Sequence, residues 1–271
     1  MRRPRVCIIT GFGINADEEL AYAFDRAGGD AVRVHVRDLI SAPRLLSTFR
    51  ILAFPGGFSF GDHLGSGKVF ATLFRRSLGA ELREFIAGGG LVLGICNGFQ
   101  VLVKMGVLPN LERKGAQEVS LIHNDSGKYE DRWVRVRFEQ GSRCVWTREL
   151  SDMDLPVRHG EGKFVVSGNE AMSALEASGL IALRYTAGET GSEEVRYPDD
   201  PNGSDGHVAG ICDLTGRVFG LMPHPEAFLH PENHPQWNFP AAPPRHGGRR
   251  LQGEGLRILA NGVRAADGRR S

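Results

Sequence analysis

The stretch LVLGICNGFQVLVKM (residues 91–105) decides the fold, because a strand pattern gives way to a helix pattern within it. Leu91 to Ile95 form an unbroken apolar run, which is typical of a central parallel strand that is buried on both faces. The segment from Gly98 to Met105 is predicted to be a helix. A buried strand that leads directly into a helix is the repeating unit of α/β folds.

Strand and helix patterns alternate on both sides of this stretch. In the first half, short apolar runs predict strands at 6–9, 31–36 and 50–54, and apolar stripes predict helices at 17–27 and 67–87. The second half is richer in strands, with strands at 117–123 and 133–138, a hairpin from 208–213 and 217–222, helices at 169–178 and 254–265, and a surface loop at 229–250. We therefore predict an α/β fold with a mostly parallel central sheet flanked by helices, an additional antiparallel β portion, and one domain over residues 1–271.

The junction Gly94-Ile95-Cys96-Asn97-Gly98 matches the nucleophile-elbow pattern, a glycine-framed nucleophile between a strand and a helix. The glycines allow a sharp turn in which backbone passes close to the nucleophile. The start of the following helix supplies free N–H groups and the positive end of its dipole, which favour a thiolate and stabilise an oxyanion. Cys96 is thus the candidate nucleophile, although a buried structural cysteine would also fit the pattern.

A thiol nucleophile needs a base, and His224 is the best candidate among nine histidines. It directly follows the apolar run 218–222, and catalytic groups gather at strand ends in parallel sheets. Glu226, two residues later, can hold one tautomer of the imidazole. His159 is the rival base, but the run Leu155-Pro156-Val157 before it is too short to predict a buried strand. Arg158 belongs to a set of arginines that are expected to be solvated.

Two further glycine-rich stretches follow predicted strands. PGGFSFG (55–61) comes after the strand at 50–54, where its backbone amides could form an oxyanion hole or simply a turn. GFGINA (11–16) matches a dinucleotide-binding pattern, but three acidic residues at 17–19 would repel a pyrophosphate. A partial phosphate-loop pattern at 65–69 and a set of histidines at 224, 230 and 234 are likewise weak, so we expect no metal site.

Composition excludes several other classes of protein. Lysine and arginine number 33 and aspartate and glutamate 32, so a net charge of +1 argues against nucleic-acid or membrane partners. The four cysteines are widely separated, which gives little support to zinc or dithiol chemistry. No apolar run approaches the roughly 18 residues of a membrane span, and no secretory signal is visible. We therefore expect a cytoplasmic protein with free thiols.

Five motifs together resemble the class I, triad-type glutamine amidotransferases. They are PGGFSFGD (55–62), GICNGFQ (94–100), RHGEGKF (158–164), YPDDPNGS (197–204) and GLMPHPE (220–226). The first, third and fourth motifs resemble one branch, the glutaminase subunits of phosphoribosylformylglycinamidine synthase. That enzyme converts formylglycinamide ribonucleotide (FGAR) to formylglycinamidine ribonucleotide (FGAM) in purine biosynthesis.

The resemblance implies roles for individual residues. Cys96 would attack the side-chain amide of L-glutamine, His224 would transfer the proton, and Glu226 would orient His224. The resemblance further implies an oxyanion hole and a substrate pocket, which would be formed by Gly57 and Asn97 and by Gly56, Phe58, Gln100, His159 and Gly160 respectively. The chain would need no cofactor, because ATP and Mg²⁺ would be used by a large synthetase subunit, with a small accessory subunit as a second partner.

Other functions stay open on the sequence alone. The chain could belong to the GMP synthetase, anthranilate or carbamoyl phosphate branches of the amidotransferases. It could be a stand-alone cysteine hydrolase that uses the same elbow. A nucleotide-binding module built on GFGINA and a catalytically silent homologue are less well supported, because cysteine, histidine and glutamate are all present.

Overall fold

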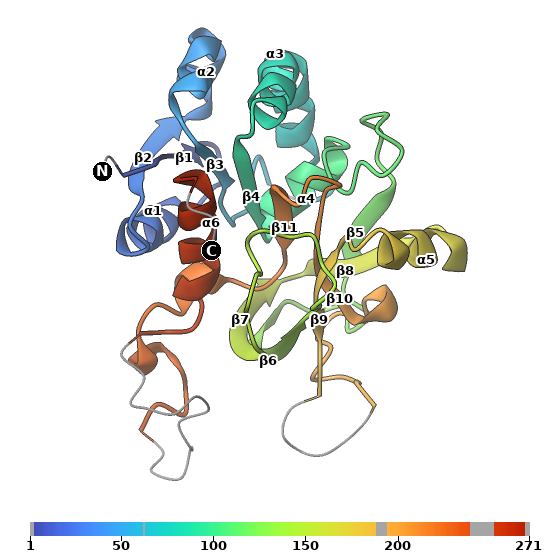
Figure 1. Cartoon of the computed structure of the whole chain (residues 1–271). Coiled ribbons are helices and arrows are strands. Elements are labelled where there is room, and N and C mark those ends of the chain that lie inside the picture. The colour runs from blue at the N-terminus through green and yellow to red at the C-terminus, as the bar shows by residue number, and fades with distance from the viewer. Residues whose placement is uncertain (1–2, 62, 188–193, 239–251, 269–271) are drawn as a thin grey trace.

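A computed structural model describes residues 3–61, 63–187, 194–238 and 252–268 (Figure 1). Nine strands form one sheet in the order β2-β1-β3-β4-β11-β10-β9-β6-β7. Their bounds in chain order are β1 (Arg5–Thr10), β2 (Asp30–His35), β3 (Ile51–Phe54), β4 (Leu91–Ile95), β6 (Glu130–Phe138), β7 (Met153–His159), β9 (Ile181–Tyr185), β10 (Val208–Cys212) and β11 (Val218–Leu221). The five strands from β2 to β11 pair in parallel, and the remaining pairs are antiparallel.

A small antiparallel sheet of β5 (Val119–His123) and β8 (Glu161–Val166) lies beside the large one. The helices are α1 (Asp17–Arg26), α2 (Val36–Ser41), α3 (Lys68–Ala87), α4 (Asn97–Lys104), α5 (Asn169–Ala177) and α6 (Leu256–Ala266). Short 3-10 turns occur at η1 (Pro43–Thr48), η2 (Asp205–His207), η3 (Pro225–Ala227) and η4 (Pro231–Asn233). None of the described helices is both long and apolar enough to cross a membrane.

Helices cover both faces of the parallel half of the sheet. The chain moves from β1 to β2 in one direction across the sheet and from β3 to β4 in the other. Crossovers between parallel strands follow a right-handed rule, and opposite directions of travel then place α1 and α3 on opposite faces of the sheet. The last helix, α6, packs against α1, and α4 packs against α3 (Figure 1). Every residue of β3, β4 and β11 is buried as a result, which explains their continuous apolar sequences.

The predicted fold class is confirmed, with four elements that the sequence analysis missed. They are α2, β7, β8 and β9. The expectation that no buried strand precedes His159 was wrong, because β7 runs from Met153 to His159 and most of its residues are buried. Proline interrupts the strand pattern at Pro156, yet β7 is the edge strand of the sheet, where proline is tolerated. The predicted loop 229–250 contains η4, and its residues 239–250 lie outside the described part of the chain.

Candidate active site

Cys96 lies at the sharp turn between β4 and α4. Its backbone has φ +51° and ψ −106°, a conformation that non-glycine residues rarely adopt. Its N–H donates to Leu221 O at 2.8 Å, and its Sγ contacts Arg158 O at 3.5 Å. Such strain costs on the order of 1–3 kcal/mol and persists where the surrounding structure imposes it.

The two glycines of the elbow are required by close backbone contacts. A Cβ atom at Gly98 would lie 2.0 Å from Phe54 O on β3, and one at Gly94 would lie 2.7 Å from the carbonyl carbon of Gly98. The start of α4 therefore sits directly against β3 and β4. This packing places the N-terminus of α4 beneath the thiol, as the sequence pattern predicts.

His224 reaches the same sheet edge from the neighbouring strand. β11 pairs with β4 in parallel, so that Leu221 lies opposite Ile95 and both strands end at one level. The His224 N–H donates to Pro156 O at 2.8 Å, which ties the turn to β7. The Nδ1 atom contacts Glu226 Oε1 at 2.7 Å, and Nε2 has no hydrogen-bond partner among the described residues. Glu226 thus fixes the imidazole and leaves Nε2 free to exchange a proton.

The charge state of His224 is set by its neighbours. Burial by itself lowers the pKa of His224, but the negative charge of Glu226 and the interaction with the Cys96 side chain outweigh that effect and raise it to about 10. At neutral pH the imidazole is therefore protonated and can act as a proton donor. The Glu226 carboxylate is itself buried, which strengthens its effect on the ring.

His159, the rival base, is held as a neutral ring. The Asn124 side chain donates to His159 O, and its Oδ1 accepts from Gly162 N–H at 3.1 Å and contacts His159 Nδ1 at 3.1 Å. Since an amide oxygen only accepts, the hydrogen of the ring lies on Nδ1. Burial, followed by the positive charge of His224, lowers the pKa of His159 to about 3. Within the described part of the chain, His159 has no carboxylate at hydrogen-bond distance, so its geometry suits it to supporting the site.

The two predicted oxyanion-hole residues, Gly57 and Asn97, lie in segments that are joined by a side-chain hydrogen bond. Asn97 Oδ1 accepts from Ser59 N–H at 3.2 Å, which ties the loop after β3 to the first turn of α4. The N–H of Gly57 donates no hydrogen bond among the described residues, and N–H groups in a first helical turn have no intrahelical partner. Gly57 has φ +145°, and a Cβ atom there would lie 2.6 Å from Gly13 O, so that only glycine fits.

A cavity of about 220 Å³ opens beside these groups. The predicted site residues that line it are Gly57, Phe58, Cys96, Gln100, His159, Gly160 and His224. The other three predicted residues support it from behind. Gly56 packs against the His224 ring, where a Cβ atom would lie 2.8 Å from Cε1, while Asn97 and Glu226 are buried. Gln100 accepts from Asn97 Nδ2 through Oε1 and donates to Glu161 O through Nε2, so it joins the elbow to the turn before β8.

Seven further lining residues were not assigned to the site from the sequence. They are Asn15, Ala16, Glu19, Ser66, Tyr129, Arg158 and Glu161. The first three belong to the loop after β1 and the start of α1, a region that was considered only for nucleotide binding. Their position after the carboxyl end of β1 could have indicated that they belong to the site. The carboxyl ends of parallel strands lie at one edge of the sheet, and this edge is where ligands bind. Arg158 was placed among solvated arginines, although its backbone contacts Cys96.

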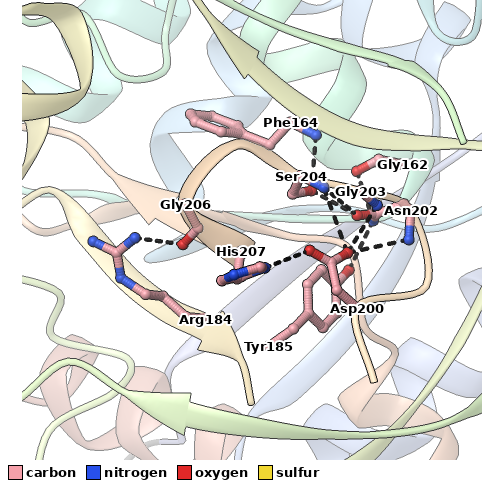
Figure 2. A network of polar contacts seen from close by, with 10 residues as sticks. All are labelled: Gly162, Phe164, Arg184, Tyr185, Asp200, Asn202, Gly203, Ser204, Gly206 and His207. Atoms are coloured by element: carbon pink, nitrogen blue, oxygen red, sulfur yellow. Dashed lines mark hydrogen bonds and ion pairs between the residues drawn. The ribbon is translucent and has the colours of Figure 1, made fainter. Parts of the chain in front are cut away.

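A network of polar contacts around residues 200–204 holds β8, the strand whose first residue, Glu161, lines the cavity (Figure 2). Asn202 Nδ2 donates to Gly162 O at 2.9 Å and to Tyr185 Oη at 3.1 Å. Its Oδ1 accepts from the Ser204 hydroxyl at 2.6 Å, and the same hydroxyl oxygen accepts from Phe164 N–H at 2.9 Å. The motif thereby fastens β8 to β9 and positions the turn that carries His159 and Glu161.

Replacing Asn202 with alanine is expected to lower the free energy of unfolding by about 2–4 kcal/mol, because it leaves buried polar partners unsatisfied. Chemical denaturation followed by circular dichroism measures this change. The exposed Asn169 at the start of α5 provides the control, and Asn169→Ala should stay within about 0.5 kcal/mol of the parent. An equally small effect of Asn202→Ala would show that the network does not hold β8.

Among the described residues, no group of three or more histidine, cysteine, aspartate or glutamate side chains is arranged to hold a metal ion. The protein thus has an α/β fold with a cysteine at a strand–helix elbow and a histidine–glutamate pair at the end of the adjacent strand. These features define a thiol-dependent enzyme of the triad type. The chain belongs to the CobB/CobQ-like glutamine amidotransferase domain family, whose model matches residues 3–264.

Individual relatives refine this assignment and confirm the family expected from the motifs. The phosphoribosylformylglycinamidine synthase subunit PurQ of Dehalococcoides mccartyi is 41% identical over 266 residues, which cover 98% of this chain and 99% of the relative. The human phosphoribosylformylglycinamidine synthase is 40% identical over 257 residues, which cover 89% of this chain but only 19% of that protein. The solved structure of PurLQS from Thermotoga maritima matches with a TM-score of 0.69 and 27% identity, over 97% of this chain and 98% of the matched chain.

Proposed function

We propose that this chain is the glutaminase subunit of phosphoribosylformylglycinamidine synthase. It would hydrolyse L-glutamine to glutamate and ammonia, and the ammonia would be used to convert FGAR to FGAM. The observation that carries the proposal is the strained Cys96 at the cavity, with the His224–Glu226 pair at the end of the neighbouring strand. The names of the D. mccartyi and human relatives support the particular branch.

The chemistry follows from the positions of these groups. Cys96 Sγ attacks the carboxamide carbon, and the oxygen takes up negative charge that the N–H groups of Gly57 and Asn97 stabilise. His224 protonates the nitrogen, the C–N bond breaks, and ammonia leaves a γ-glutamyl thioester on Cys96. Water, deprotonated by His224, then attacks the thioester and releases glutamate. Glu226 stabilises the imidazolium in both steps.

The amination step is assigned to a separate synthetase subunit. Activation of an amide oxygen needs ATP and Mg²⁺, and we place both on that partner. The human relative supports this division, because most of its length has no counterpart in this chain. A small accessory subunit would complete the assembly. Ammonia released into water would be diluted and protonated, so we infer that it passes to the partner within the complex.

The test measures glutamate release from glutamine by the full chain, alone and then with both partner subunits, ATP, Mg²⁺ and FGAR. We expect weak release alone and a strong rise in the complete mixture. High release alone that does not respond to the partners would indicate a free-standing hydrolase or another amidotransferase branch. No release under either condition would reject the glutaminase itself.

A further inference from the structure

Two oppositely charged side chains from distant parts of the chain meet at the cavity. Glu19 lies in the first turn of α1 and Arg158 lies near the end of β7, and both line the cavity. Arg158 Nη1 and Glu19 Oε2 are 3.8 Å apart, and the two side chains are 41% and 53% exposed. An ion pair at this exposure is weak, so a ligand can separate the two groups with little loss of stability.

The position of Arg158 connects this pair to the nucleophile. Its carbonyl oxygen contacts Cys96 Sγ at 3.5 Å, so the guanidinium is carried by a residue whose backbone touches the reacting atom. Arg158 is the only lysine or arginine that lines the cavity among the described residues. Besides the imidazolium of His224 beside the nucleophile, Arg158 is therefore the cation that the described lining residues offer to the anionic end of a substrate. Guanidinium groups hold carboxylates through two parallel hydrogen bonds.

Two carboxylates line the cavity, and they differ in their availability. Glu161 is 10% exposed, and its Oε2 accepts from Ser66 N–H at 3.2 Å, so it is committed to holding the loop before α3. The Glu19 carboxylate contacts only Arg158 among the described residues. If Arg158 binds a substrate carboxylate instead of Glu19, the Glu19 carboxylate loses its ion-pair partner. It can then bind a positively charged group of the substrate.

L-Glutamine carries matching charges at the end opposite its reacting group. When its carboxamide carbon lies at Cys96 Sγ, its α-carbon is three carbon–carbon bonds away, and the α-ammonium and α-carboxylate point away from the elbow. We propose that Arg158 binds the α-carboxylate and Glu19 binds the α-ammonium group of glutamine. The assignment rests on the proposed function and names the residues that select an α-amino acid. It also gives Glu19, in the first turn of α1, a role in substrate selection.

The test compares three amides that share one reacting group. They are L-glutamine, glutaramate, which lacks the α-ammonium group, and 4-aminobutanamide, which lacks the α-carboxylate. Ammonia release is measured for the full chain in complex with its partner subunits. Glu19→Gln should lower kcat/KM for glutamine about tenfold to a hundredfold, mainly through KM, and leave the value for glutaramate unchanged. Arg158→Gln should act in the same way on glutamine and leave the value for 4-aminobutanamide unchanged.

Matched controls separate this role from general changes of charge. Glu18→Gln removes the neighbouring acid, which is 78% exposed and pairs with Arg33 at 2.7 Å. Arg137→Gln removes an exposed arginine of β6 that pairs with Glu139. Neither control should change the preference for glutamine over the two analogues. A change in partner docking would affect all three amides equally and would therefore not mimic the expected pattern.

The outcomes distinguish this inference from the proposed function. If the unmodified chain in its complex releases ammonia from none of the amides, the glutaminase assignment fails. If the unmodified chain is active but Glu19→Gln lowers kcat/KM for glutamine and glutaramate by the same factor, Glu19 does not bind the α-ammonium group. An unchanged preference in Arg158→Gln would exclude the guanidinium as the carboxylate ligand.

Discussion

Cys96→Ala is expected to lower glutamate release from glutamine by about 10⁴-fold or more, because it removes the atom that forms the thioester. The same variant should still support FGAM synthesis by the partner subunits when ammonium is added, since no other group of the cavity wall is altered. Glutamate and FGAM are measured separately in the two assays. The side chain is small and lies at the cavity, so we expect the variant to fold.

Cys7→Ala is the control for loss of a buried thiol. Cys7 lies within β1, and burial raises the pKa of its thiol to about 12, so it is not a nucleophile at neutral pH. Its removal should leave the glutaminase rate within a few-fold of the parent. Loss of both glutamine-driven and ammonia-driven synthesis by Cys96→Ala, in a complex that still assembles, would contradict the assigned role.

Glu226→Gln is expected to reduce the glutaminase rate by about 10² to 10⁴-fold. The substitution keeps the size of the side chain but removes the negative charge that lies 2.7 Å from His224 Nδ1. That charge is a main reason why the pKa of His224 is raised to about 10. The variant imidazole should therefore lose its proton at a lower pH, and it can then no longer protonate the leaving nitrogen.

The pH dependence of kcat/KM distinguishes this electrostatic role from a structural one. Because a raised pKa keeps His224 protonated up to alkaline pH, the rate of the parent should fall only as the pH approaches about 10. In Glu226→Gln the fall should begin at a clearly lower pH. Glu232→Gln, a change at an exposed position on η4, should keep the parent profile. If Glu226→Gln is slower but its kcat/KM falls at the same alkaline pH as that of the parent, the negative charge of Glu226 does not set the pKa of His224.

Local sequence was sufficient to predict the parallel half of the sheet and the strand–helix elbow that carries Cys96. Residues 91–105 contain an apolar strand, two glycines that allow close backbone contact and a helix, and each of these signals arises within a few positions. The pairing of His224 with Glu226 was also predictable from local sequence. The two residues are only two positions apart, and the carboxylate lies at hydrogen-bond distance from the imidazole. Periodicity and glycine placement act over short distances, so they can be interpreted without knowledge of the rest of the fold.

Edge and antiparallel elements were harder to predict. β7 contains a proline and alternates in burial only partly, because it is an edge strand that pairs with β6 alone. Missing this strand led to the wrong reason for ranking His159 below His224. The structure supplies a better one, since His159 has Asn124 rather than a carboxylate beside Nδ1. Side-chain partners of this kind come from distant segments of the chain, so the sequence around His159 does not predict them.

The walls of the cavity depend on tertiary packing throughout. Glu19, Cys96 and Arg158 are far apart in the chain, and they meet because β1, β4 and β7 present their ends to one cavity. The order of strands in a sheet follows from long-range pairing and crossover handedness, which no short motif encodes. Short-range patterns therefore indicate which residue can act as a nucleophile and which pair can serve it, whereas long-range pairing decides which charges face the substrate.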